Sequence, residues 1–225
     1  QSAMATSIQP STLHFLIDLS INNYRVWFED NREAYKLARA NFLDFIQEII
    51  DDLAQDDDSV HGLQAKDCAF RIYRDVRFNK DKSPYKVHFG ASIKPGGRKS
   101  GKAGYYFHLE PGKSFIGGGI YNPESDQLSH IRKKISGDYS GFTKILAEEK
   151  FRSLYTDIDR TDKYLLKRVP RGFKATDPAA GYLLLTSYLS TINLDDDLLV
   201  SPTLHKYTVG AFQALHPVIR FLNEV

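Results

Sequence analysis

The sequence predicts an α+β fold, in which a central antiparallel meander of about four strands, residues 68–121, lies between N-terminal and C-terminal helices. Before residue 55 and after residue 123 the apolar residues recur every three or four positions, as in helices. Between residues 68 and 121 they alternate with a period of two, as in strands. No Ser/Gly-rich linker or internal repeat divides the chain, so we expect one domain over residues 4–225. Residues 1–3 precede the only methionine, Met4, and are interpreted as an expression scar.

The N-terminal helical part is expected over residues 10–55. Its apolar stripe includes Leu13, Leu16, Phe42, Phe45 and Ile49. The acidic run after residue 50 ends the helices in a solvated loop.

Four strands are expected next, joined by turn residues. They are Phe70 to Phe78, Val87 to Ile93, Tyr105 to Leu109, and the stretch from Phe115 to Tyr121. Turn chemistry falls at residues 79–84, 95–97 and 111–112, so consecutive strands pair antiparallel.

The rest of the chain, residues 123–222, is predicted to be helical. Pro123 opens one helix, Pro178 opens a second that includes Leu183 to Leu189, and His205 to Leu222 forms a last helix that contains Pro217.

Charge is unevenly distributed along the chain. Residues 1–65 hold four Lys/Arg against eleven Asp/Glu, a net −7, whereas residues 66–104 hold eleven against three, a net +8. Such segregation attracts anions to the basic middle, unless the acidic helices pack beside it and cancel the field.

The densest basic stretch is FRIYRDVRFNKDKSPYK, residues 70–86, with six cations and two acids. Arginine forks beside lysines are typical of phosphate or carboxylate recognition. We therefore expect a ligand site in which Tyr85 is an orienting group and the cations are Arg71, Arg74, Arg77, Lys80, Lys82 and Lys86. Salt bridging to the acidic N-terminal half is the alternative. Arg74 falls among the apolar positions and needs a partner, either an N-terminal acid or a ligand.

Two histidines form a second candidate. His88 and His108 lie on the less apolar sides of their strands, and a symmetric hairpin register would place them opposite each other, near Tyr106 and Glu110. Two imidazoles and a carboxylate could bind zinc or perform acid–base chemistry, and a polar cross-strand pair is the other interpretation. No metal ligand is assigned from the sequence.

Two glycine-rich stretches fail as nucleotide motifs. The loop from Gly96 to Ala103 lacks the P-loop hydroxyl and runs into a strand. In FIGGGIYN, Asn122 replaces the third glycine of a dinucleotide fingerprint, so the glycines indicate a bulge or the close approach of a backbone or ligand.

The chain resembles a family named domain of unknown function 2461. The resemblance rests on the stretch from Phe70 to Lys86, supported by FIGGGIYNP at residues 115–123 and KRVPRGF at residues 167–173. It covers nearly the whole chain. It implies a one-domain, cytoplasmic protein and transfers no catalytic residue or activity.

Three functions follow as hypotheses. The leading one is a binding domain for a phosphorylated or other anionic ligand. The second is an enzyme on such a ligand that uses His108 or Glu110 for proton transfer. The third is an interaction module that docks an acidic protein or nucleic acid. No apolar run reaches the roughly 18 residues that span a bilayer, so we expect no membrane association. The sequence identifies no cofactor and no oligomeric state.

Overall fold

The computed structural model describes residues 5–224, so the interpretation of residues 1–3 lies outside the described part. The N-terminal helices are α1 (Pro10–Ile21), α2 (Arg25–Asp30) and α3 (Arg32–Leu53), followed by a 3-10 turn (Asp58–Val60) and α4 (Ala65–Cys68). Phe42, Phe45 and Ile49 are buried on one side of α3. The predicted N-terminal helical part is therefore confirmed.

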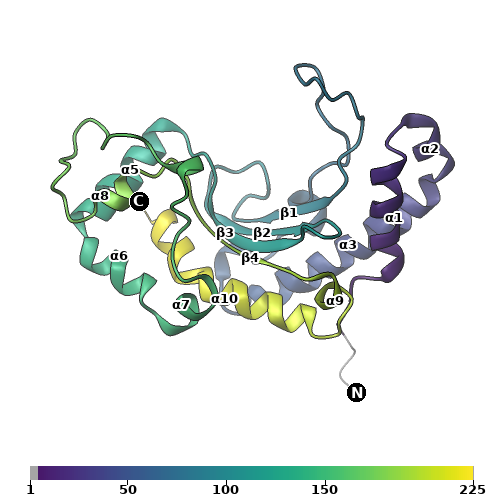
Figure 1. The fold of residues 1–225 in the computed structure, drawn as a ribbon. Helices are drawn as coiled ribbons and strands as arrows, with labels where there is room; N and C mark the ends of the chain where they lie inside the picture. Colours follow the sequence, from purple (N-terminus) through teal and green to yellow (C-terminus); the bar gives the residue numbers. More distant parts are fainter. Residues whose placement is uncertain (1–4, 225) are drawn as a thin grey trace.

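The sheet has four antiparallel strands in the order β1-β2-β3-β4. They are β1 (Phe89–Ile93), β2 (Gly104–Leu109), β3 (Phe115–Ile120) and β4 (Tyr188–Asn193). The α+β fold class with an open four-stranded sheet is confirmed, and three of its strands lie where the alternation predicts them (Figure 1).

The fourth strand corrects the prediction of a helix from Leu183 to Leu189. Only a short helix, α8 (Ala180–Leu183), forms there, and the chain then continues as β4 beside β3. A short apolar run is compatible with either a helix or a buried strand. Here the run pairs with β3 and is therefore a strand. A Cβ on Gly117 would lie 2.2 Å from the Ser190 carbonyl oxygen, and a Cβ on Gly119 would lie 1.9 Å from that of Tyr188. The glycines of FIGGGI thus mark the close approach of another backbone, one of the expected explanations.

The stretch from Phe70 to Phe78 is not a strand, which is a second correction. It makes one isolated bridge, Tyr73 with Tyr85, and Ala69 just before it makes another with Ala91. Residues 70–88 form an irregular hairpin, here called the basic arm, that stands away from the β1 edge of the sheet (Figure 1). Phe78, near the tip of the arm, is 95% exposed. The alternating pattern alone could not show that the segment leaves the core.

The C-terminal part contains five more helices besides α8 and a 3-10 turn (Asp162–Tyr164): α5 (Ser125–Gly137), α6 (Tyr139–Leu146), α7 (Glu149–Tyr155), α9 (Asp196–Leu199) and α10 (Leu204–Asn223). α10 packs on β3 and α3 packs on β1, both on the same face of the sheet (Figure 1). The buried hydrophobic side chains form one contiguous cluster. The single domain over residues 4–225 stays a prediction.

No helix within residues 5–224 is both long and apolar enough to cross a membrane. A cytoplasmic location stays a prediction.

Candidate functional site

The two faces of the sheet differ in cover and in chemistry. Along β2, Tyr105, Phe107 and Leu109 are buried under α3 and α10, whereas the alternate residues Tyr106 and His108 are half-buried on the other side. This second side, here called the open face, carries no helix above it in Figure 1. It therefore leaves polar side chains accessible on a rigid support.

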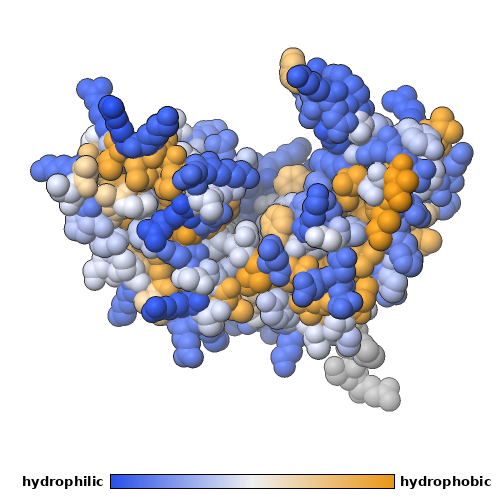
Figure 2. Space-filling view, in the orientation of Figure 1, coloured by the Kyte–Doolittle hydropathy of each residue, from blue (hydrophilic) through white to orange (hydrophobic). Residues whose placement is uncertain are grey.

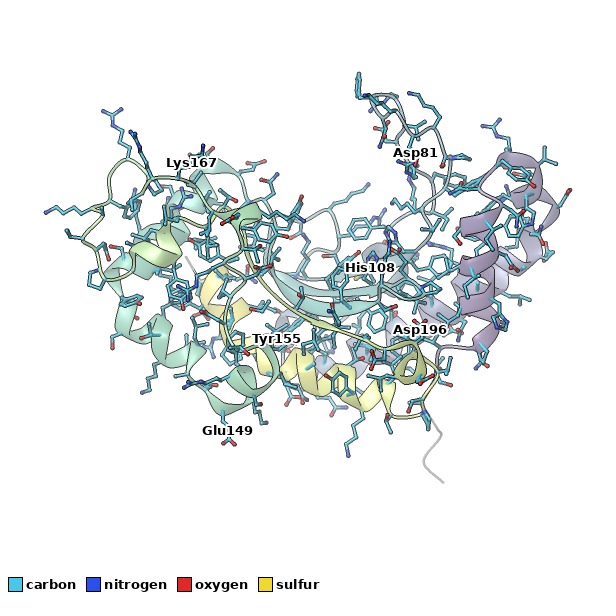
Figure 3. All side chains as sticks on the ribbon, in the orientation of Figure 1. Asp81, His108, Glu149, Tyr155, Lys167 and Asp196 are labelled. Atoms are coloured by element: carbon cyan, nitrogen blue, oxygen red, sulfur yellow. The ribbon has the colours of Figure 1, made fainter. Side chains whose placement is uncertain are left out.

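The open face is the floor of a hollow. Figure 2 shows the surface hollowed between the basic arm and the loop of residues 165–178, here called the opposite loop. Figure 3 shows Asp81 on the arm, Lys167 on the opposite loop and His108 on the floor between them. A ligand that occupies the hollow would thus lie against the open face.

His88, His108 and Glu110 come together on this floor. The strand register pairs His108 with Gly90, so His88 is shifted two residues from the symmetric alignment expected from the sequence. A shift of two keeps every side chain on its own face. The two imidazole rings stack with centroids 4.3 Å apart. The expected proximity of the histidines is therefore confirmed, although the expected register is wrong.

A chain of hydrogen bonds runs along β2. The Tyr106 hydroxyl lies 2.9 Å from Nδ1 of His108, and Nε2 of the same ring lies 3.0 Å from Oε1 of Glu110. Nδ1 of His88 lies 3.9 Å from the same carboxylate oxygen. Glu110 is thus placed to orient His108, while Tyr106 occupies the other ring nitrogen.

Burial tunes two of these groups. Burial, followed by the nearby charge of Glu110, raises the pKa of Tyr106 to about 12. Burial, followed by repulsion from His108, lowers the pKa of His88 to about 4. At neutral pH, Tyr106 is therefore a neutral hydroxyl and His88 a neutral imidazole with a free lone pair on one nitrogen.

Two neighbours shape the floor that the sequence analysis did not single out. Phe115 stacks on the His108 ring with centroids 4.6 Å apart. Gly90 provides space for Tyr106, since a Cβ at this position would lie 2.6 Å from the Tyr106 hydroxyl oxygen. Only the strand register reveals both, because Phe115 and Gly90 are the cross-strand partners of His108.

The positive charges in the middle of the basic arm are neutralised by acidic residues of the arm itself. Arg77 forms a two-pronged ion pair with Asp75 at 2.8 and 3.0 Å. Arg74 donates to the Ser83 carbonyl at 2.8 Å and lies 3.4 Å from the Asp81 carboxylate. The partner of Arg74 is thus an acid of the arm itself, neither of the two partners expected.

The remaining predicted site residues separate into three environments. Lys82 donates to the Val76 carbonyl, and Lys80 is exposed near the tip. Tyr85 is only 3% exposed, and its ring stacks on the ring of Phe28 with centroids 4.1 Å apart. It therefore anchors the arm to α2.

Arg71 and Lys86 lie at the base of the arm, next to the open face. Lys86 donates to the Arg71 carbonyl oxygen at 2.6 Å, and its Nζ lies 5.7 Å from the ring centroid of Phe70. The Phe70 ring in turn packs edge-on against Tyr106. Burial, followed by repulsion from Arg71 and Arg98, lowers the pKa of Lys86. These three cations, Arg71, Lys86 and Arg98, are here called the basal cations.

Salt bridging to the acidic helices does not explain the arm. Within residues 5–224, no Lys or Arg of the arm lies within 4 Å of a carboxylate of α1, α2 or α3, and the ion pairs of the arm involve its own Asp75 and Asp81. The expected alternative of pairing with the N-terminal half is therefore not seen.

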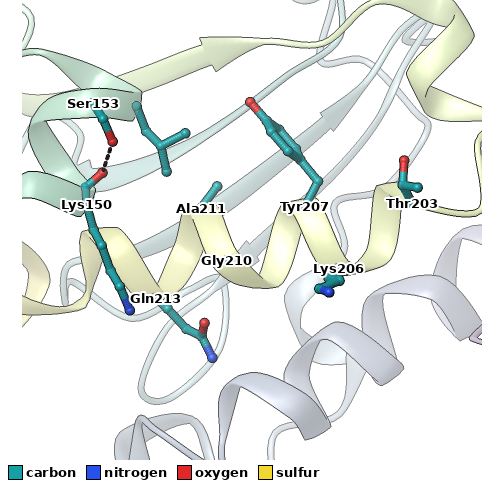
Figure 4. A pocket seen from close by; sticks show the side chains of 9 residues that line it. Lys150, Ser153, Thr203, Lys206, Tyr207, Gly210, Ala211 and Gln213 are labelled. Carbon is teal, nitrogen blue, oxygen red and sulfur yellow. Dashed lines mark hydrogen bonds between the residues drawn. The ribbon is translucent and has the colours of Figure 1, made fainter.

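Two other concavities lie away from the histidines. A groove of about 540 Å³ runs between α7 and α10 and is lined by Lys150, Lys206 and Tyr207 among others (Figure 4). A smaller one of about 360 Å³ lies beside Gly96, Gly97 and Arg98. Neither lining includes a histidine, and the loop at Gly96 ends in β2, as expected for a basic hairpin loop.

The family described as conserved hypothetical protein (DUF2461) matches residues 11–221, nearly the whole chain. The chain belongs to this family. No curated protein and no solved structure matches it. Membership of DUF2461 confirms the resemblance seen in the sequence and brings no activity with it, so the function of this DUF2461 protein has to be argued from its own geometry.

Proposed function

We propose that this protein binds a small anionic ligand, carrying phosphate or carboxylate groups, at the basal cations beside the open face. The observation that carries the proposal is a cluster of positive charge without a counter-ion. Among the described residues, no carboxylate lies within 4 Å of the charged groups of Arg71, Lys86 or Arg98. Lys86 and Arg98 instead donate to backbone carbonyls.

The contrast within the arm supports this choice of residues. Arg74 and Arg77 each have an acid beside them, so an incoming anion would have to displace it. The basal cations repel one another, and a bound anion would relieve that repulsion while accepting charge-assisted hydrogen bonds. The proposed site is therefore smaller than the full set of predicted residues.

Thermal unfolding against a panel of anions tests the proposal. The panel holds inorganic phosphate, pyrophosphate, nucleotides, sugar phosphates, polycarboxylates and short RNA, added to protein freed of metal by a chelator. A ligand at a hundred times its dissociation constant stabilises by about 2.7 kcal/mol, which raises Tm by roughly 5–10 °C in a chain of this length.

Charge-matched variants locate the site. Arg71→Gln and Lys86→Gln should abolish the Tm response to the active anion. Arg77→Gln removes one positive charge from the same arm and should leave the response unchanged. Equal loss in all three variants would indicate a diffuse charge effect, and the absence of a response across the panel would refute the proposal.

The panel also separates a small ligand from nucleic acid. The opposite loop, which lies across the hollow from the arm and carries Lys167 (Figure 3), has exposed cations, among them Lys167, Arg168 and Arg171. A polyanion that spans the hollow would respond to their removal and would weaken steeply with salt. A response to RNA alone, with a steep salt dependence, would therefore replace the small ligand by nucleic acid.

An enzyme that acts on the same ligand is the second candidate, because Tyr106, His108 and Glu110 are joined by hydrogen bonds. A histidine oriented by a carboxylate is suited to proton transfer. For an anion that the panel identifies, His108→Gln should abolish any turnover measured by mass spectrometry and leave binding intact. Binding without turnover in the parent protein would leave a binding domain.

A further inference from the structure

We propose that His88, His108 and Glu110 bind a divalent first-row transition metal ion such as Zn²⁺ on the open face. Within residues 5–224, these three form the one group of three His, Cys, Asp or Glu residues whose donor atoms can converge on an ion. The sequence by itself assigns no metal ligand, because it does not specify the strand register that joins the three.

The distances between the donor atoms suit one ion. Nε2 of His108 and Nδ1 of His88 lie 3.0 and 3.9 Å from Oε1 of Glu110, and all three ligand atoms lie within 4.8 Å of one another. Tetrahedral zinc with bonds near 2.0–2.1 Å separates its ligand atoms by about 3.3 Å. Small movements of the side chains therefore bring the set to bonding distance.

His88 is the side chain that has to move for all three ligand atoms to reach one ion. The two rings are stacked with an angle of 29° between their planes, so one ring must turn before both nitrogens point at one ion. His108 is held from both sides by Tyr106 and Glu110. His88 is 27% exposed in its side chain and makes no side-chain hydrogen bond in the described part of the chain. It is free to turn toward an ion.

Tyr106 supplies the outer support that metal-binding histidines need. When Nε2 of His108 coordinates the ion, Nδ1 carries the proton. The Nδ1–H group then donates a hydrogen bond to the Tyr106 hydroxyl oxygen, 2.9 Å away. Such a bond fixes the ring orientation and the tautomer, and its loss typically weakens metal binding 10- to 100-fold. Gly90 keeps the space that this hydroxyl occupies.

The donor set selects the kind of ion. Two imidazole nitrogens and one carboxylate oxygen favour Zn²⁺, Co²⁺ or Fe²⁺ over Mg²⁺ and Ca²⁺, which prefer all-oxygen sites. Three protein ligands leave at least one position for water or another ligand. All three side chains are partly exposed, so solvent can reach that position.

Titration of metal-free protein tests the inference directly. Protein stripped with a chelator and moved into phosphate-free buffer is titrated with Zn²⁺ by calorimetry and with Co²⁺ by visible absorption. We expect one tightly bound equivalent of each, the absorption bands of four- or five-coordinate cobalt, and no saturable binding of Mg²⁺. Absence of saturable Zn²⁺ and Co²⁺ binding would overturn the proposal.

Variants assign the ion to the cluster. Glu110→Gln and His88→Gln should weaken Co²⁺ binding at least 100-fold, and Tyr106→Phe about 10-fold. His61→Gln removes an exposed imidazole elsewhere and should change nothing. Unchanged affinity in both Glu110→Gln and His88→Gln would place the metal at another site and refute the inference.

A measurement on the parent protein avoids dependence on variant folding. X-ray absorption of the zinc-loaded protein should show two imidazole ligands together with oxygen, and one imidazole or none would contradict the assignment. The result is separate from the anion proposal. Anion binding is measured in chelator and metal binding without anions, so either can fail while the other stands.

Discussion

The two faces of the sheet are made by the same strands but have opposite roles. On the covered face, Phe107 packs against Phe42 and Phe45 of α3, with its side chain fully buried. On the open face, one residue away along β2, His108 bonds to Tyr106 and Glu110. The comparison teaches that neighbouring positions of one strand have different roles: one side chain stabilises the core, and the next belongs to the polar cluster. Substitutions on the covered face should mainly lower the stability of the protein, and those on the open face should also change what it binds.

The largest effect is expected from Phe107→Ala. Removing a buried phenyl ring from a packed core costs about 3–5 kcal/mol, because apolar contact is lost and a cavity remains. Urea unfolding should show this as a lower midpoint with an unchanged slope. A cost below about 1 kcal/mol would mean that the covered face is not the structural one.

Gly90→Ala tests whether the space at Gly90 holds Tyr106 in place on the open face. The new methyl group would lie 2.6 Å from the Tyr106 hydroxyl oxygen, so the ring must move and its bond to His108 breaks. We expect a loss of about 1–3 kcal/mol in the free energy of unfolding. Metal affinity should fall together with it, and Gly137→Ala, at an exposed position with open space around it and no left-handed φ, provides a control for the loss of glycine alone. Unchanged metal affinity in Gly90→Ala would separate Tyr106 from the proposed site.

The pH dependence of stability gives a third test, made on metal-free protein. Burial, His108 and Lys86 lower the pKa of His88 to about 4, against the opposing charge of Glu110, so the unfolded chain binds a proton at a higher pH than the folded protein does. The stability that neutral His88 provides is therefore present above about pH 6.5 and is lost as the pH falls toward 4.

The matched variant isolates this contribution. His88→Gln should lose less stability than the parent between pH 7 and pH 4, by on the order of 1 kcal/mol. Parallel pH profiles for the two proteins would show that His88 is not held neutral by the fold.

The smallest effect is expected at the arm. Arg77 and Asp75 form an ion pair whose side chains are more than half exposed, and such surface pairs add little to stability because solvent screens them. Arg77→Ala should therefore change the urea midpoint only slightly. A fall in the midpoint as large as that of Phe107→Ala would show that the arm is part of the structural core.

The sequence by itself determined the helices at both ends, three of the four strands and the presence of two histidines and a carboxylate on the less apolar side of the sheet. These features depend on local periodicity, which the order of residues specifies directly. It also indicated that the glycines of β3 mark a bulge or the close approach of a backbone or ligand, and that the basic stretch is a distinct segment of the chain.

Only the tertiary structure decided what those segments meet. β4 comes from about 70 residues beyond β3, and its pairing follows from backbone approach at Gly117 and Gly119, which no local pattern records. The sequence does not show which arm cations have an acid beside them, and in the structure Asp75 and Asp81 pair only with Arg77 and Arg74 in the middle of the arm. A register shift of two residues kept His88 on the face of His108 and Glu110. Long-range pairing sets register, burial and charge neighbours, and these decide which polar residues are available for chemistry.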